Sequence, residues 1–150
     1  MGLLSKLFSK PPESRPQIND AVLGAVIFNP KERLWQASVN FDGSYIFIGI
    51  EGDESPAQVL LERARGLAAA APGFRARLAE FLNHESLAHF SSISHHEMYQ
   101  REIAVLELDQ LLLLFPEKPQ HTSASLTGGT LGHWSVDMEG DRFVALIGPE

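Results

Sequence analysis

Every second residue from Trp35 to Phe41 is apolar, and the residues between them are polar. A period of two is typical of a β-strand that buries one face. The dipeptide Asp42-Gly43 follows at once, and it readily adopts the positive φ angles of a type I′ turn. The pattern therefore predicts a hairpin in which residues 34–41 fold back on residues 44–51.

A two-residue turn also fixes the register of this hairpin, because it decides which residues of the two strands face each other. The expected pairs are Phe41 with Ser44, Val39 with Ile46, Ala37 with Ile48 and Trp35 with Ile50. On the other face Tyr45 lies beside Asn40 and Phe47 beside Ser38, so two aromatic rings stand among polar neighbours. This second face is either a contact surface or a surface that a helix or the N-terminal tail covers.

Strand and helix signals continue on both sides of the hairpin. The apolar run over residues 21–28 predicts a buried strand. Ser55-Pro56-Ala57-Gln58 combines a capping Ser, a Pro at the first helical position and a Gln that closes a capping box. Pro72-Gly73 ends this helix, a second helix begins near Phe74, and residues 94–97 mark the start of a short third helix.

The pattern returns to strands after the helices. The expected strands cover residues 111–115, 123–127, 131–138 and 142–147. A two-residue turn at Gly140-Asp141 would join the last two strands. The pairs expected across it are Met138 with Phe143, Val136 with Ala145 and Trp134 with Ile147.

Strands, then helices, then strands again are typical of the α+β class. We expect an antiparallel meander sheet of three N-terminal and three to four C-terminal strands, with two or three helices inserted between them and packed on one side. Residues 20–150 form one α+β domain in this interpretation. Residues 1–19 precede it as an amphipathic N-terminal tail and a Pro-rich linker.

Composition narrows the function classes. The chain has no cysteine, which excludes disulfides and thiolate metal sites and favours a cytoplasmic location. Its formal net charge of −7 disfavours nucleic acid as a partner, because binding to phosphates depends on Lys and Arg. The same negative charge favours association with a basic protein partner. We expect no cofactor and no stable insertion into a membrane.

Candidate catalytic residues are sparse. His133, Ser135 and Asp137 share one face of an expected strand, but alternate residues lie about 6.6 Å apart along a strand, beyond direct hydrogen-bond reach. Four other histidines, His84, His89, His95 and His96, lack the four-residue spacing that places two ligands on one helix face, so we expect no metal site. A small hydrolase using His133 and Asp137 remains the enzymatic alternative.

Charged residues suggest contact surfaces instead. Glu51, Asp53 and Glu54 follow the hairpin, and together with Asn40, Tyr45 and Phe47 they form the binding site that the sequence suggests. A second acidic group consists of Glu97, Glu102, Glu107 and Asp109. Four arginines flank the bend between the first two helices, either as an anion site or as a solvated helix face: Arg63, Arg65, Arg75 and Arg77.

Three segments carry a resemblance to a known group of proteins. The segments are Leu34-Trp35-Gln36 through Asp42-Gly43, then Gly52-Asp53-Glu54-Ser55-Pro56, and Gly132-His133-Trp134-Ser135-Val136-Asp137. They resemble a group of uncharacterised bacterial α+β domains, some of whose relatives occur beside polymorphic toxins and are thought to act as immunity proteins. The resemblance implies an immunity-type inhibitor and assigns no catalytic residue.

The leading hypothesis is therefore a non-catalytic protein-interaction domain, in the form of an immunity-type inhibitor that contacts a basic toxin. The first alternative is the small hydrolase that uses His and carboxylate groups. The second is a self-associating structural subunit, in which an exposed strand or the N-terminal tail closes a homodimer.

Overall fold

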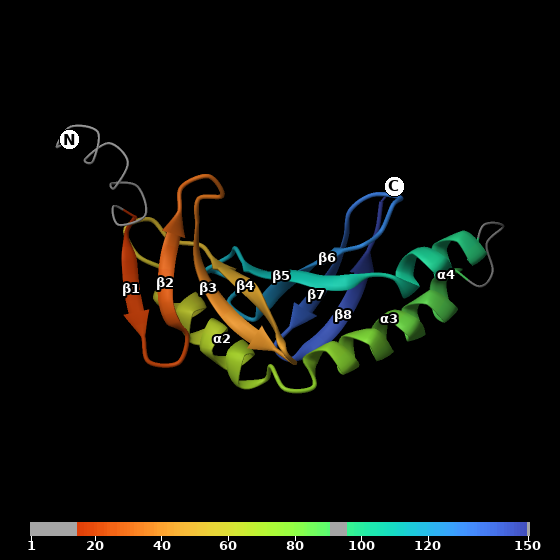
Figure 1. Cartoon of the computed structure of the whole chain (residues 1–150), viewed down its shortest axis with the longest axis horizontal. Coiled ribbons are helices and arrows are strands. Elements are labelled where there is room, and N and C mark those ends of the chain that lie inside the picture. Colours follow the sequence, from red (N-terminus) through yellow and green to blue (C-terminus); the bar gives the residue numbers. More distant parts are fainter. Residues whose placement is uncertain (1–14, 91–95, 150) are drawn as a thin grey trace, which may run out of the picture.

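Two four-stranded meanders join into one sheet. The computed structural model describes residues 15–90 and 96–149. The strands lie side by side in chain order (Figure 1): β1 Gln17–Asp20, β2 Gly24–Asn29, β3 Leu34–Phe41, β4 Ser44–Ile50, β5 Glu107–Leu113, β6 His121–Thr127, β7 Trp134–Glu139 and β8 Arg142–Ile147. All neighbouring strands are antiparallel except β4 and β5, which run parallel at the centre. The α+β meander architecture is confirmed, with four strands in each half.

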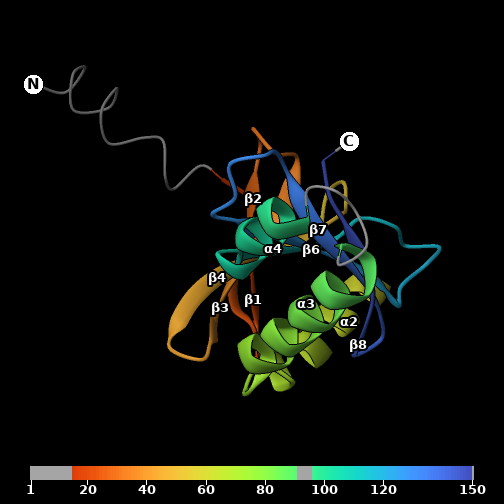
Figure 2. The same ribbon diagram turned by 90° about the vertical axis from the view of Figure 1, so that its right-hand side faces the viewer.

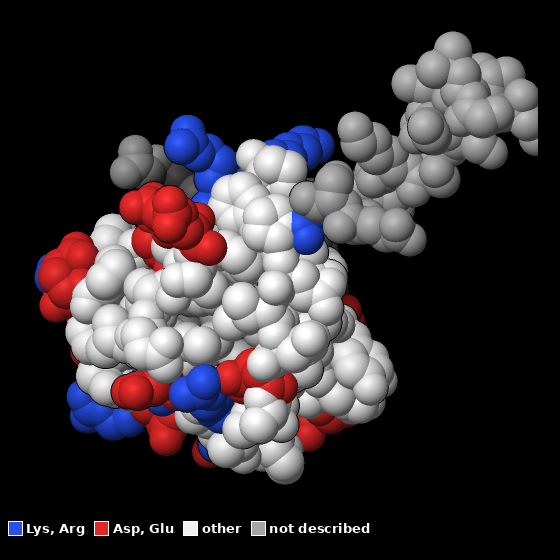
Figure 3. Space-filling view, turned by 90° about the vertical axis from the view of Figure 1, so that its left-hand side faces the viewer, with Lys and Arg blue, Asp and Glu red and all other residues white. Residues whose placement is uncertain are grey.

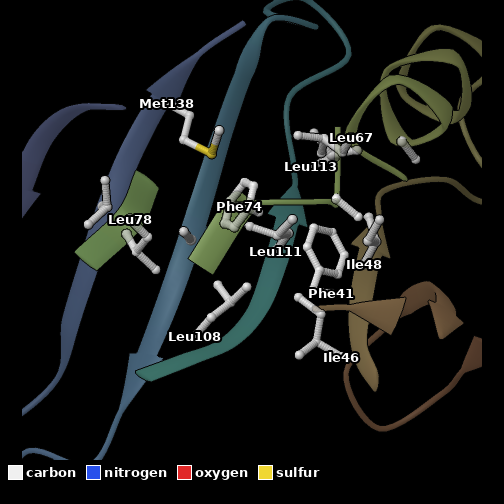
Figure 4. Close-up of a cluster of buried hydrophobic side chains, with 14 of the residues drawn as sticks. Phe41, Ile46, Ile48, Leu67, Phe74, Leu78, Leu108, Leu111, Leu113 and Met138 are labelled. Atoms are coloured by element: carbon white, nitrogen blue, oxygen red, sulfur yellow. The ribbon is translucent and has the colours of Figure 1, made fainter. Parts of the chain in front are cut away.

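The helices fill the connection between β4 and β5, because parallel neighbours need a crossover. They are α2 Gln58–Ala69, α3 Phe74–Phe90 and α4 His96–Ala104. Helices α2 and α3 run along one face of the sheet, and α4 folds back on α3 (Figures 1 and 2). The buried core lies between them and the sheet; Figure 4 shows side chains of α3 and of the strands meeting there. Phe74 of α3 packs edge-on against Phe41 of β3, with ring centroids 5.2 Å apart.

The central hairpin has the predicted register. Trp35 pairs with Ile50, Ala37 with Ile48 and Val39 with Ile46, and the turn residues Asp42 and Gly43 have φ angles of 55° and 99°. The Asp42 carboxylate also accepts hydrogen bonds from the backbone N–H groups of Gly73 and Arg75 at 2.8 and 3.1 Å. These bonds lower the pKa of Asp42 and attach the turn to the start of α3.

The N-terminal edge of the sheet differs from the expectation. The run over residues 21–28 is not one strand, because Asp20 Oδ2 accepts hydrogen bonds from the N–H groups of Val22 and Leu23 and turns the chain there. Strand β2 begins only at Gly24, whose φ is +75°. The preceding strand β1 takes in residues 17–19, which the sequence placed in the linker. Arg65 of α2 donates to Asp20 at 2.9 Å and ties this edge to the helical layer.

The start of α2 also differs from the prediction. The N-cap is Ala57, without a side-chain capping bond, so the capping box from Ser55 does not form. A tight loop accounts for the change: Trp35 Nε1 donates to Gly52 O at 3.2 Å, and Ala57 N–H donates to Glu51 O at 2.9 Å. A Cβ on Gly52 would lie 2.1 Å from Ser55 O, so the loop closes on itself. Helix α4 begins at His96, and the expected cap at Ser94 lies outside the described residues.

The C-terminal hairpin contains an irregularity that the sequence did not indicate. Met138 pairs with Phe143 as predicted, but the pairings of Val136 with Ala145 and of Trp134 with Ile147 are wrong. The register shifts between Asp137 and Met138, which leaves Val144 without a partner on β7. This extra residue is a β-bulge, and beyond it every residue of β8 faces a different partner. Leu146 therefore pairs with Val136, and Ile147 pairs with Ser135.

The helices among residues 15–90 and 96–149 include none with the length and apolar character needed to cross a bilayer. The expected amphipathic tail at residues 1–10 lies outside the described part of the chain.

Candidate functional site

One face of the sheet carries no described helix. We call this surface, which is made by the strand side chains that point away from α2 and α3, the open face. It includes Ile27, Ser38, Asn40, Tyr45, Phe47, Gln110, Ser135, Asp137 and Ile147. Tyr45 is 71% exposed and Phe47 49%, whereas Ile46 between them is 7% exposed and points into the core. The sequence left open that a helix or the N-terminal tail covers this face: no described helix does so, and the tail at residues 1–14 lies outside the described part of the chain.

Asn40 lies beside Tyr45 as predicted, but its side chain stabilises the hairpin turn. Its Oδ1 accepts a hydrogen bond of 2.7 Å from the N–H of Gly43 and closes the turn. The amide nitrogen of Asn40 is the polar group left for a partner at this position. The aromatic part of the suggested site is therefore carried by Tyr45 and Phe47.

The acidic part of the suggested site lies in a cleft at the other end of β4. The cleft has a volume of about 560 Å³ and is lined by Phe28, Glu32, Arg33, Leu34, Glu51, Gly52, Asp53 and Leu114. Glu51 and Asp53 thus come together, while Glu54 is exposed but not in the lining. Sequence reasoning missed Glu32 and Arg33, which reach the cleft from the turn between β2 and β3. Arg33 has a φ of 59°, in the left-handed region that residues other than glycine rarely adopt. The sequence pattern does not indicate this conformation.

The two parts do not form one compact site. Tyr45 and Glu51 are six residues apart on the same extended segment, a separation of about 20 Å along a strand. A partner that touched both would have to lie along the whole length of β4. Figure 3, seen from the β1 side, shows a broad uncharged surface with acidic and basic groups at its rim.

The four arginines near the helix bend are used to hold the fold. Arg63 donates to Gly140 O and reaches Asp141 at 3.2 Å, and Arg65 pairs with Asp20. Arg75 donates to Phe41 O at 2.9 Å, and Arg77 donates to Ala70 O at 3.2 Å. Each guanidinium thus joins a helix to a turn or strand, or, in the case of Arg77 of α3, to the C-terminal end of α2. Arg75 and Arg77 also lie close enough to the carboxylate of Asp42 to help lower its pKa, so that an anion of the fold itself occupies their surroundings.

The residues of the enzymatic alternative are not brought into contact. His133 is exposed in the loop before β7, while the contact of Asp137 is with His121 of β6, Oδ1 to Nε2, at 3.4 Å. The other ring nitrogen of His121, Nδ1, is buried. A catalytic histidine that is oriented by a carboxylate needs its second nitrogen free to meet a nucleophile or substrate. Neither histidine has that geometry here.

Glu102 was expected in an acidic group that forms a contact surface, and this expectation is wrong because the residue is buried. The residue is 5% exposed, and its carboxylate accepts hydrogen bonds from Thr130 N–H, Leu131 N–H and Trp134 Nε1 at 2.7, 2.7 and 3.0 Å. The bond from the backbone of Thr130 is the main cause of a lowered pKa. A carboxylate that is held ionised by several donors stabilises the loop before β7 and is unsuited to be a general base.

Among the described residues, no three His, Asp or Glu side chains converge in a way that could hold a metal ion. Comparisons with protein families, with curated proteins and with solved structures found no match.

Proposed function

We propose that this chain is a non-catalytic protein-interaction domain that binds a protein partner through its open face. The observation that carries the proposal is the pair of aromatic rings at Tyr45 and Phe47, which are 71% and 49% exposed in the middle of a regular sheet. Tyrosine and other aromatic side chains dominate the energetics of many protein interfaces, because they bury much area at little cost in conformational entropy.

The rigidity of the platform supports the same function. Phe47 pairs with both β3 and β5, and Tyr45 pairs with Asn40 of β3, so that their backbone does not have to be ordered when a partner binds. Binding to a preorganised surface loses less entropy than binding to a loop. A cytoplasmic immunity-type inhibitor, the form of the proposal that the sequence resemblance implies, would act in this way by covering a working surface of its target.

A capture experiment with matched variants tests the proposal. The chain is immobilised in three forms: wild type, Y45S/F47S, and V22S. Val22 is an apolar side chain with 58% exposure that lies in the turn between β1 and β2, away from β4. All three forms are exposed to extract of the native cell, and retained proteins are quantified by mass spectrometry.

We expect a protein that the wild type and V22S retain and that Y45S/F47S loses at least tenfold. Equal retention by all three forms would place the contact elsewhere on the chain. If no protein is enriched over a blank support at either low or high salt, the proposed class of function is wrong.

A further inference from the structure

We propose that the part of the open face over β4 and β5 recognises cationic side chains, so that the partner presents an arginine- or lysine-bearing segment there. This inference rests on the proposed function and adds the chemistry of the partner to it. It is carried by the way in which a β-bulge in β5 places a carboxylate beside Tyr45 and Phe47.

The bulge follows from the burial of β5. Leu108 and Leu111 are 5% and 0% exposed, and both belong to the core under the sheet. Residues three apart in a regular strand point to opposite faces, so both can face the core only if the alternation is interrupted between them. The register with β6 does shift between Leu108 and Gln110. Asp109 and Gln110 therefore both lie on the open face, and Asp109 is exposed.

The parallel pairing with β4 fixes where this carboxylate lies. Gln110 is the partner of Phe47, where the parallel ladder begins, so Asp109 stands one residue before the ladder, next to Phe47. Paired strands are about 4.8 Å apart, so the carboxylate lies close to the Phe47 ring. Tyr45 is on the same face of β4, two residues before Phe47. Glu107, two residues before Asp109, is exposed at the start of β5 and lines a cleft there together with Arg75 and Leu78 of α3.

The distribution of charged residues over the strands favours binding of a cation near Asp109. Among the described strands the acidic residues are Asp20, Glu107, Asp109, Asp137 and Glu139, whereas Lys and Arg are represented there by Arg142 alone. Two of these have ion-pair partners, Asp20 with Arg65 and Asp137 with His121, and Glu139 lies opposite Arg142 in the register of the last hairpin. Within the described part of the chain Glu107 and Asp109 have no ion-pair partner. The charge beside Tyr45 and Phe47 is thus available to another molecule.

A guanidinium or ammonium group can interact with both features of this surface, the aromatic rings and the exposed carboxylate. It is attracted to the face of an aromatic ring and to a neighbouring carboxylate, whereas a phosphate or a carboxylate ligand would be repelled. Arginine suits the site better than lysine, because its planar group stacks on a ring while its edge binds a carboxylate. The occupant is therefore a basic polypeptide segment of the partner.

The test uses a short peptide with two arginines between glycines as the probe, and the same peptide with citrulline in place of arginine as its neutral match. Each is titrated into the isotopically labelled full chain, and amide shifts are followed by NMR. We expect shifts at Tyr45, Phe47 and Gln110 with the arginine peptide and at least tenfold weaker binding of the citrulline peptide. Raising the salt from about 50 to about 300 mM should weaken the arginine peptide several-fold, because the charges are exposed.

Matched variants separate this site from general attraction to a chain of charge −7. D109N and E117Q each remove one exposed negative charge, and Glu117 lies in the loop after β5, beyond the end of that strand opposite to Asp109. We expect D109N and Y45A to weaken the arginine peptide at least fivefold and E117Q to change it less than twofold. Equal losses in D109N and E117Q, or shifts located elsewhere, would overturn the inference. A captured partner that needs Tyr45 and Phe47 but ignores D109N and salt would also overturn it, while leaving the proposed function intact.

Discussion

The indole Nε1 of Trp134 donates a 3.0 Å hydrogen bond to the buried carboxylate of Glu102. The bond joins α4 to the start of β7 across a gap of 32 residues in the chain. The same carboxylate holds the backbone of Thr130 and Leu131, so one side chain from the helical layer organises the whole approach to β7. A Cβ on Gly129 would lie 2.6 Å from Glu102 Oε2, which shows how closely the loop wraps this group.

The first prediction concerns Glu102→Gln. A glutamine keeps the shape but replaces one acceptor oxygen by an NH₂ group, which would face donors that it cannot satisfy. We expect a clearly lower urea midpoint and a changed fluorescence of Trp134 in the folded state. Glu97→Gln is the control, because that carboxylate is on the same helix but 73% exposed, and it should alter the stability by less than about 0.5 kcal/mol. Equal midpoints for the two variants would contradict the anchoring role.

The second prediction concerns acid stability. Arg65 lowers the pKa of Asp20 from 3.8 to about 2 by hydrogen bonding to its carboxylate. Because the folded state prefers the ionised form, Asp20 stabilises the fold fully above its unfolded pKa and loses this contribution as the pH falls toward its folded pKa. The free energy of unfolding should therefore drop between about pH 4 and about pH 2.

Asp20→Asn isolates this contribution. Urea titrations of the wild type and the variant at about pH 6 and about pH 3 should show a smaller acid loss for the variant. The lowered pKa values of Asp42 and Glu102 act in the same direction, so part of the loss remains. An unchanged acid loss in the variant would show that the bond between Arg65 and Asp20 does not contribute in solution.

The third prediction concerns the turn of the central hairpin. Gly43 has a φ of 99°, which a side chain with a Cβ adopts only at a cost. Gly43→Ala should lower the free energy of unfolding by about 1–2 kcal/mol, and Gly43→Asn by less, because asparagine tolerates positive φ better than alanine does. Nothing lies within 4 Å of a Cβ built there, so a clash does not contribute. Equal losses for the two variants would argue against a strain in φ as the cause.

The fourth prediction uses the alternation along β4. Tyr45→Ala should change the free energy of unfolding by less than about 0.5 kcal/mol, because the ring lies on the surface. Ile46→Ala, one residue further, should cost about 2–5 kcal/mol, because it empties a core position that is 7% exposed. Urea denaturation of both variants measures the contrast. A large loss in Tyr45→Ala would mean that something covers the open face, which would remove the basis for the interaction surface.

Local chemistry made the central hairpin predictable. The alternation from Trp35 to Phe41 and the turn at Asp42-Gly43 determine both strands and their register without reference to the rest of the chain. The same kind of argument failed at β8, because nothing in the local sequence indicates the bulge at Val144 that shifts the register. It failed again at Ser55, where the tight loop around Gly52 takes precedence over a good capping sequence.

The candidate site was predictable to a similar extent. The hairpin register placed Tyr45 and Phe47 on the face away from the core, but the sequence could not decide whether that face is covered. Glu32 and Arg33 reach the cleft near Glu51 only through the folding of strands around it. Asp109 stands beside the rings because of a bulge and a parallel pairing, and both depend on contacts between residues that are distant in the chain. Glu102 looked like any other acid on a helix until its donors from the β6–β7 loop were known.

The parallel contact between β4 and β5 has a consequence for how the molecule assembles. Each four-stranded meander can form from hairpins between consecutive strands. The two halves pair only when the chain has closed a loop of residues 51–106. Closing so long a loop costs entropy that grows with the logarithm of its length, and contacts of high sequence separation slow folding. We therefore expect the parallel pairing between Phe47–Ile50 and Gln110–Leu113 to form late, after both halves of the sheet. Packing of the helices against both halves would bring the two strands together.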